Sequence, residues 1–122
     1  MSKKIKNKRV YQDYLNDINT SIAEILEFTE GMNFEEFSFD RKTSHAVTRC
    51  FEIIGEAVKK IPDELRAKYP GIPWREMTGM RDKMIHEYFG VNLQIVWQTI
   101  EEDIPLLEKM IKEVISYETK FD

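Results

Sequence analysis

The sequence predicts an all-α protein, a four- to five-helix bundle that runs up and down in its main helices. Apolar residues recur at three- and four-residue steps along several segments, which is the spacing of one face of an α-helix. No alternating run of β-branched residues competes as a strand. Turn residues such as Gly31, Pro70-Gly71 and Gly90 separate the periodic segments, where they are expected to end helices.

The first half of the chain predicts two long helices. The first is expected to stop at Gly31, and its apolar stripe consists of Tyr11, Tyr14, Leu15, Ile18, Ile22, Ile25 and Leu26. A short connector follows, and its three aromatic side chains are expected to plug one end of the bundle: Phe34, Phe37 and Phe39. Asp40 could cap the second long helix, whose wide apolar stripe between Ala46 and Ile61 predicts a central position.

Three further helices are expected in the second half. Pro62 suits the first turn of a short helix that ends near residues 69–71. Pro73 is expected to open a helix that continues to about Gly90. Asn92 is a reasonable cap for the last helix, whose apolar positions keep the 3.6-residue period to Ile115. Pro105 falls inside that pattern and should kink the last helix.

Length and charge favour one acidic domain. The 122 residues are enough for one core, expected at residues 10–118, behind a flexible basic tail at residues 1–9. The tail carries five positive charges and no acid, yet the whole chain has a net charge of −4. That balance argues against a protein that coats nucleic acid by bulk charge.

Several protein classes are disfavoured by what the sequence lacks. No apolar run is long enough to span a bilayer, and the basic N-terminus has no apolar stretch typical of a signal peptide. One cysteine, Cys50, cannot form an internal disulfide, and with two histidines it provides no Cys/His metal cluster. We therefore expect a cytoplasmic protein without a metal site.

The segment between Arg81 and Tyr88 carries the chemistry. It places an arginine, a histidine (His86) and a tyrosine within eight residues. A guanidinium is a permanent cation suited to phosphate, and an imidazole can move protons near neutral pH. Together these groups are sufficient for phosphodiester cleavage with no metal and no cofactor.

The chain resembles the HepT-like toxin family of the HEPN superfamily of helical ribonucleases. The likeness covers roughly residues 10–115 and rests on segments in matching order and spacing: Ile54-Gly55-Glu56-Ala57, Ile72-Pro73-Trp74, Met80-Arg81-Asp82, His86-Glu87-Tyr88-Phe89, Val96-Trp97-Gln98-Thr99-Ile100 and Asp103-Ile104-Pro105. It implies a HEPN-like fold and a metal-independent endoribonuclease that forms homodimers. It also implies an MntA-type nucleotidyltransferase antitoxin as partner, with which two dimers could assemble into a larger complex.

The family motif maps onto four positions of this chain, and the resemblance gives them roles. Arg81 and His86 become the catalytic pair, and Tyr88 an RNA contact and the acceptor of AMP from the antitoxin. Asp82 stands where the family often has asparagine; it could pair with Arg81 or orient His86, but it adds negative charge where a phosphate should bind. Glu56 could pair with Arg81 or support the cleft.

Neighbouring residues have simpler expected roles. Gly55 is expected to allow close helix packing. Trp74 and Trp97 could stack bases, but both lie on apolar stripes and are expected in the core or a dimer surface. Met77, Met80 and Met84 are expected to pack in the core. His45 could face the cleft, although a surface position is favoured.

The spacing of the motif raises a geometric problem. At about 100° per residue, Arg81 and His86 lie about 140° apart on a regular helix, so one straight helix would not aim both at the same atom. Either the helix ends or distorts near Gly90, or a two-fold dimer brings two motifs into one cleft. We favour the dimer, because an isologous contact duplicates every residue across its axis.

The chemistry expected of this pair is transesterification. His86 would serve as base or acid for attack by the RNA 2′-hydroxyl on the adjacent phosphorus, and Arg81 would stabilise charge on the phosphoryl oxygens. The products would be a 2′,3′-cyclic phosphate and a 5′-hydroxyl. A non-catalytic helical scaffold for the nucleotidyltransferase is the alternative function, and a plain structural bundle is a third.

Overall fold

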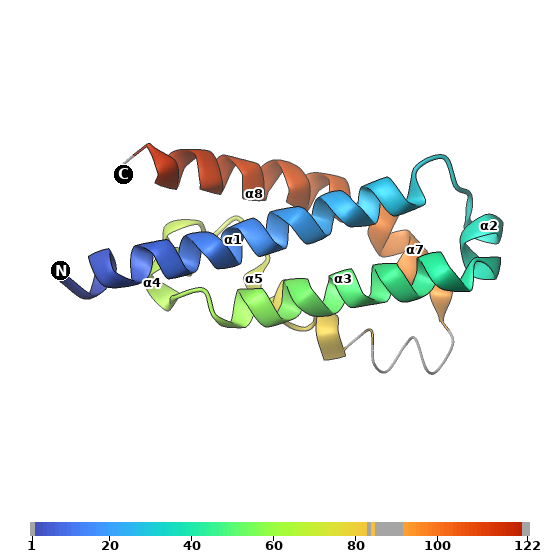
Figure 1. Ribbon diagram of the computed structural model, residues 1–122, viewed down its shortest axis with the longest axis horizontal. Coiled ribbons are helices and arrows are strands. Elements are labelled where there is room, and N and C mark those ends of the chain that lie inside the picture. Colours follow the sequence, from blue (N-terminus) through green and yellow to red (C-terminus); the bar gives the residue numbers. More distant parts are fainter. Residues whose placement is uncertain (1, 83, 85–91, 121–122) are drawn as a thin grey trace.

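The computed structural model describes residues 2–82, 84 and 92–120, with side chains from Tyr11 onward. Its long helices are α1 (Ser2–Thr29), α3 (Arg41–Lys59) and α8 (Ile104–Thr119). α1 packs against both α3 and α8, and α3 runs antiparallel to α1 (Figure 1). This arrangement confirms the expected all-α bundle.

Shorter helices complete the bundle, with α2 at one end and α4 near the other (Figure 1). They are α2 (Phe34–Phe39), α4 (Asp63–Lys68), α5 (Trp74–Thr78) and α7 (Leu93–Glu102). Asp40 caps α3 by accepting a hydrogen bond from the Thr43 backbone N–H at 3.0 Å, and Asn92 caps α7, as the sequence predicted. Gly31 follows α1 with a φ of 77°, a conformation that favours glycine. In the described part of the chain, no helix combines the length and apolar character needed to cross a membrane.

The first part of the chain differs from expectation in two ways. α1 begins at Ser2, so the backbone of residues 2–9 is helical, while the flexibility expected of the tail at residues 1–9 stays a prediction. Lysine and arginine are good helix formers, and no proline or glycine interrupts that segment. The connector after Gly31 contains a helix, α2, because Asn33 and Glu36 form a capping box that starts it.

The aromatic plug expected at this end is also only partly correct. Phe37 is buried and its ring centroid lies 5.1 Å from that of Trp97. Phe39, in contrast, is 81% exposed, so its ring points away from the bundle end. One phenylalanine of the three therefore fills the end of the core, while Phe34 is partly buried against it.

Two helices that the periodicity predicted as continuous are broken. The helix opened by Pro73 ends at Thr78, and helical backbone resumes at residues 80–82 after Gly79, a residue with low helix propensity. The kink predicted at Pro105 is a division between α7 and α8 at Asp103. Proline lacks the N–H that a helix interior requires but is accepted in a first turn, where Pro105 lies.

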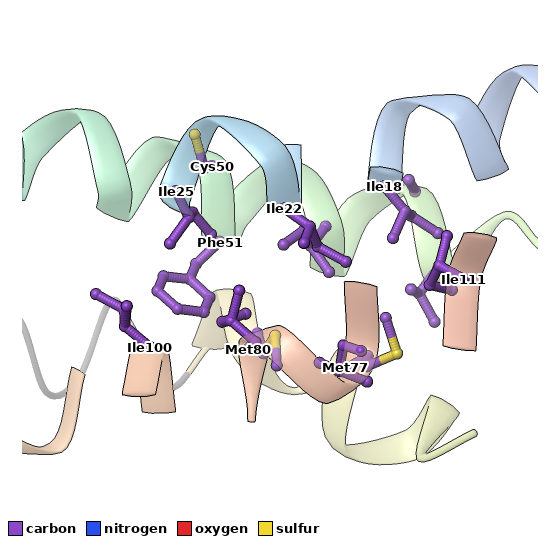
Figure 2. Packing of buried hydrophobic residues seen from close by; sticks show 14 of the residues in the cluster. Ile18, Ile22, Ile25, Cys50, Phe51, Met77, Met80, Ile100 and Ile111 are labelled. Carbon is purple, nitrogen blue, oxygen red and sulfur yellow. The ribbon is translucent and has the colours of Figure 1, made fainter. Parts of the chain in front are cut away.

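The core draws side chains from all the long helices and from the segment around α5. Figure 2 shows this convergence for Ile18, Ile22, Ile25, Phe51, Met77, Met80, Ile100 and Ile111. Trp74 and Trp97 are buried in the same cluster, which confirms the packing role expected of them. The expectation that Met77, Met80 and Met84 are packing residues is confirmed as well.

Cys50, on α3, is buried in this core. Burial, together with the charge of Glu24, raises the pKa of its thiol to about 11. The thiol is therefore neutral at physiological pH and has little of the thiolate that cysteine chemistry requires. Its observed role is packing.

A buried carboxylate fastens α8 to α1 and α4. Glu118 is only 4% exposed, and it accepts hydrogen bonds from the Tyr11 hydroxyl at 3.1 Å, the Lys68 ammonium at 2.9 Å and the Tyr69 hydroxyl. Three donors satisfy a group that would be costly to bury without partners. We call these residues the Glu118 clasp.

The clasp makes stability depend on pH. Burial alone would raise the pKa of Glu118, but the hydrogen bonds from Tyr69, Lys68 and Tyr11 together outweigh it and lower that pKa below its usual 4.5. Burial and the hydrogen bond to Glu118 raise the pKa of Tyr69. A lowered carboxylate pKa contributes stability above the unfolded value, and that contribution is lost as the pH falls through the folded pKa.

Glu118→Gln is expected to lower the free energy of unfolding by about 1–3 kcal/mol at pH 7, because two partly buried hydroxyls and an ammonium lose a charged acceptor. Urea unfolding measures this, with exposed Glu113→Gln on the same helix as the matched control. The difference from wild type should shrink as the pH falls below 4.5, the usual carboxyl pKa, and through the lower pKa of Glu118 in the folded protein. An equal loss of stability in Glu113→Gln would contradict the role of the Glu118 clasp. So would a stability difference between Glu118→Gln and wild type that does not change with pH.

Candidate functional site

Arg81 lies against α3 because Gly55 leaves room for it. A Cβ added at Gly55 would be 3.1 Å from both the Cβ and the backbone nitrogen of Arg81, and 3.2 Å from the Thr78 carbonyl oxygen. These separations are shorter than ordinary van der Waals contact, so a side chain at Gly55 would displace the segment. The buried side chains of Met80 and Met84 anchor that segment in the core. The close packing expected at Gly55 is confirmed.

The Arg81 side chain reaches from this segment to the next residue of α3. Its Nε lies 3.7 Å from Oε1 of Glu56, so the pairing expected as one of two roles for Glu56 is present. Nε is shielded from solvent and has no hydrogen bond, whereas the side chain as a whole is 42% exposed. Nε of Arg81 therefore faces Glu56, and the exposed surface of the side chain belongs to its other atoms.

Arg49, on α3, is a second arginine that approaches the carboxylate of Glu56. Nη1 of Arg49 lies 4.0 Å from Oε1 of Glu56 and 3.6 Å from Oε2 of Glu52. Positions 49, 52 and 56 are three, four and seven residues apart, so they share one face of the helix. The result is a chain of alternating charges on α3 that ends at Arg81.

The other motif residues are placed unequally. Asp82 is exposed, and among the described residues the carboxylate paired with Arg81 is that of Glu56. His86 and Tyr88 lie outside the described residues. The Arg–His geometry, and the choice between a distorted helix and a dimer, therefore stay predictions. His45 is exposed, as favoured from the sequence, on the same side of α3 as Arg49.

Sequence reasoning did not identify Arg49 as part of this arrangement. The available signal was its position seven residues before Glu56, which places the two side chains on one helical face. It was missed because Arg49 lies outside the family motif, which drew attention to Glu56 and Arg81 alone.

The arrangement around Arg81 suits the binding of an anion. An arginine fork whose Nε faces a carboxylate can still present its terminal nitrogens to a phosphate. Across the described residues, no group of three or more His, Cys, Asp or Glu side chains is arranged to hold a metal ion. The planar guanidinium of Arg81 suits a phosphate group as its ligand.

Comparison with known proteins points in one direction. The family model described as "Ribonuclease HepT-like" matches residues 18–114, which include Gly55, Glu56 and the whole motif segment. The protein "Probable ribonuclease HepT" of Thermococcus cleftensis is 54% identical over 101 residues, covering 83% of this chain and 92% of the relative.

Two other relatives give the same picture. A candidate RNase of Methanocaldococcus jannaschii is 47% identical over 108 residues, which is 88% of this chain and 93% of the relative. A candidate RNase of Caldanaerobacter subterraneus subsp. tengcongensis is 49% identical over 105 residues, which is 86% of this chain and 94% of the relative. No solved structure gives a significant match.

Gly55→Ala should reduce RNA cleavage by about tenfold to a hundredfold, because the added methyl displaces Arg81. The free energy of unfolding should change by no more than about 2 kcal/mol, since better helix propensity offsets part of the crowding. Cleavage rates and urea unfolding are measured together. Gly71→Ala is the matched control, because a Cβ at Gly71 meets nothing within 4 Å. Full activity in Gly55→Ala would show that the function of Arg81 does not depend on its close packing against Gly55.

Proposed function

The chain belongs to the HepT-like ribonuclease family, and on that premise we propose that it is a metal-independent endoribonuclease and the toxin of a toxin–antitoxin pair. The observation that carries this proposal is the agreement between the family match and the site. The match spans the segment in which Arg81 is held on α3 by Gly55 and Glu56. The substrate is RNA, and the expected compartment is the cytoplasm.

Arg81 is proposed to bind the scissile phosphate. In the transition state, negative charge builds on the phosphoryl oxygens, and a fixed guanidinium stabilises it. Glu56 supports this role by facing Nε of Arg81, which leaves the edge formed by the terminal nitrogens for the phosphate. Catalytic contacts are often long without substrate, so the 3.7 Å pairing distance is compatible with a site that tightens on binding.

His86 is proposed to move the protons. As a base it takes the proton of the RNA 2′-hydroxyl, whose oxygen then forms a bond to the adjacent phosphorus. The bond from phosphorus to the 5′-oxygen breaks, and an acid returns a proton to that leaving oxygen. The products are a 2′,3′-cyclic phosphate and a 5′-hydroxyl, and no step requires a metal ion. Asp82 would orient His86, four residues away on the same face.

Tyr88 is proposed as the point of control. A partner nucleotidyltransferase of the MntA type would transfer AMP from ATP to the Tyr88 hydroxyl and release pyrophosphate. The attached AMP adds bulk and negative charge beside Arg81, and both exclude RNA from the cleft.

The proposed active form is a homodimer. On a regular helix, His86 would point about 140° away from Arg81, so the productive pair would join Arg81 of one protomer with His86 of its partner. Dimers of this kind could assemble further with nucleotidyltransferase chains.

A non-catalytic scaffold is the second candidate function. The exposed carboxylate of Asp82 stands beside Arg81, and the chain has a net charge of −4. Both features oppose the approach of an RNA phosphate. A scaffold for a nucleotidyltransferase would tolerate the loss of His86, whereas a ribonuclease would not.

The first test is RNA cleavage by the purified protein in EDTA, with intact mass measured on the same samples. Wild type should leave cyclic phosphate ends, and His86→Ala should lower the rate by about a hundredfold or more, because the proton-transfer group is lost. Coexpression with a nucleotidyltransferase partner should add the mass of AMP to wild type but not to Tyr88→Phe.

The outcomes of this test separate the two functions. No cleavage by protein of unmodified mass would overturn the ribonuclease proposal and favour the scaffold. No cleavage by protein that carries the mass of AMP would mean that the enzyme was purified in its silenced form. Cleavage that needs a divalent ion would contradict the metal-free mechanism.

A subunit-mixing experiment tests the dimer. Arg81→Ala and His86→Ala should each be inactive alone, but equal amounts that are mixed and allowed to exchange should recover about a quarter of wild-type activity. Half of the dimers would then be mixed, and each would retain one of its two Arg–His pairs. If Arg81 and His86 of the same protomer act together, mixing would restore nothing.

A further inference from the structure

The solvent-exposed face of α3 carries cations as well as the Arg49–Glu56 chain. Lys42, His45 and Arg49 follow one another at steps of three and four residues, and all three are exposed. At about 100° per residue, these positions share one face with Glu52 and Glu56. We call Lys42, His45 and Arg49 the α3 stripe.

The stripe leads away from Arg81 along the bundle. Arg81 contacts α3 at Gly55, in the second half of the helix, and the stripe occupies the first half, toward α2 (Figure 1). Lys42 lies fourteen residues before Glu56, which is about 21 Å along an α-helix. A single phosphate bound at Arg81 could not reach that far, but a strand of several nucleotides could.

We propose that the α3 stripe is a track for the RNA backbone, on which Arg49 and Lys42 bind phosphates that flank the scissile one. The proposal rests on the ribonuclease function and names the part of the substrate that this face would hold. Of the two proposed phosphate contacts, Arg49 is the one nearer to the catalytic Arg81, because both arginines approach the same carboxylate oxygen of Glu56. Lys42 is the far one, and the proposal does not depend on His45.

The charge balance of the chain supports a local track. With a net charge of −4, the protein as a whole repels RNA, so cations must be concentrated where the strand lies. Arg49 has a side chain that is 60% exposed, so it can reach a phosphate without burial cost. Glu52 and Glu56 hold it when RNA is absent, and an arriving phosphate would compete with them.

An exposed aromatic side chain lies in sequence just before Asp40, the N-cap of α3. Phe39 lies three residues before Lys42 and is 81% exposed, which is unusual for a phenylalanine. Exposed aromatic rings stack on RNA bases without regard to sequence. Phe39 would therefore add a stacking contact where the backbone track ends.

Binding is tested apart from cleavage with a ten-nucleotide 2′-O-methyl RNA, which lacks the attacking hydroxyl. Lys42→Gln/Arg49→Gln should weaken binding by roughly tenfold at low salt. The slope of log affinity against log salt should flatten by about 0.7 for each lost phosphate contact. Phe39→Ala should weaken binding without changing that slope, because stacking releases no counterions.

Matched variants separate the track from general charge and from damage to the site. Lys109→Gln/Lys120→Gln removes the same charge from exposed positions at α8, which lies beside α1 (Figure 1), and should leave affinity near that of wild type. Glu52→Gln should tighten binding severalfold, because Arg49 loses a competing carboxylate. Lys42→Gln alone tests the track at a distance from Glu56.

Several results would overturn the proposal. An equal loss of affinity in the α8 control would mean that RNA is attracted by diffuse charge. If Glu52→Gln did not tighten binding, Arg49 would not contact RNA. In cleavage assays, the rise in KM caused by Lys42→Gln should grow with substrate length; a rise independent of length would contradict a track. If wild type binds the probe with the expected salt dependence but never cleaves RNA, the ribonuclease function fails and the track stands.

Discussion

The approach of residues 78–81 to Gly55 is the contact on which the candidate site depends. It brings an arginine from a separate segment onto α3, where Glu56 is the next residue and can face its Nε. Without this approach, Arg81 and Glu56 would belong to two unrelated surfaces. Because the atoms that face Gly55 are backbone atoms and a Cβ, rather than flexible side-chain ends, the position of Arg81 follows directly from the missing side chain.

The rest of the bundle keeps that contact in place. Met77 and Met80 extend from the same part of the chain into the core, among side chains of α1, α3 and α8 (Figure 2), and Met84 belongs to the same cluster. Methionine side chains adapt to irregular spaces, which suits a segment broken at Gly79. The Glu118 clasp joins α1, α4 and α8 through a different set of residues, so polar contacts add to apolar packing in holding the frame.

Electrostatics near Arg81 are balanced rather than strongly positive. Two arginines, Arg49 and Arg81, share the carboxylate of Glu56, while Glu52 and Asp82 add negative charge nearby. Such a site orients its cations well but attracts a polyanion weakly from a distance. Recognition of a long strand would then depend on cations placed along its path, which is the arrangement found on the exposed face of α3.

The sequence alone determined the fold class, most helices and the motif, because these depend on local periodicity and on residue types at fixed spacing. Local patterns of this kind predicted the apolar stripes of α1 and α3 and the caps at Asp40 and Asn92. The motif resemblance in turn indicated Arg81 and Glu56 as site residues. Only the tertiary structure decided which distant residues meet. The pairing of Glu118 with Tyr11, 107 residues away, leaves no local pattern, and only the fold shows that Arg49 and Arg81 approach the same carboxylate oxygen of Glu56. The break at Gly79 was hidden for another reason, since apolar periodicity continues across a helix break when both helices bury the same face, whereas Pro105 signalled the interruption near Asp103.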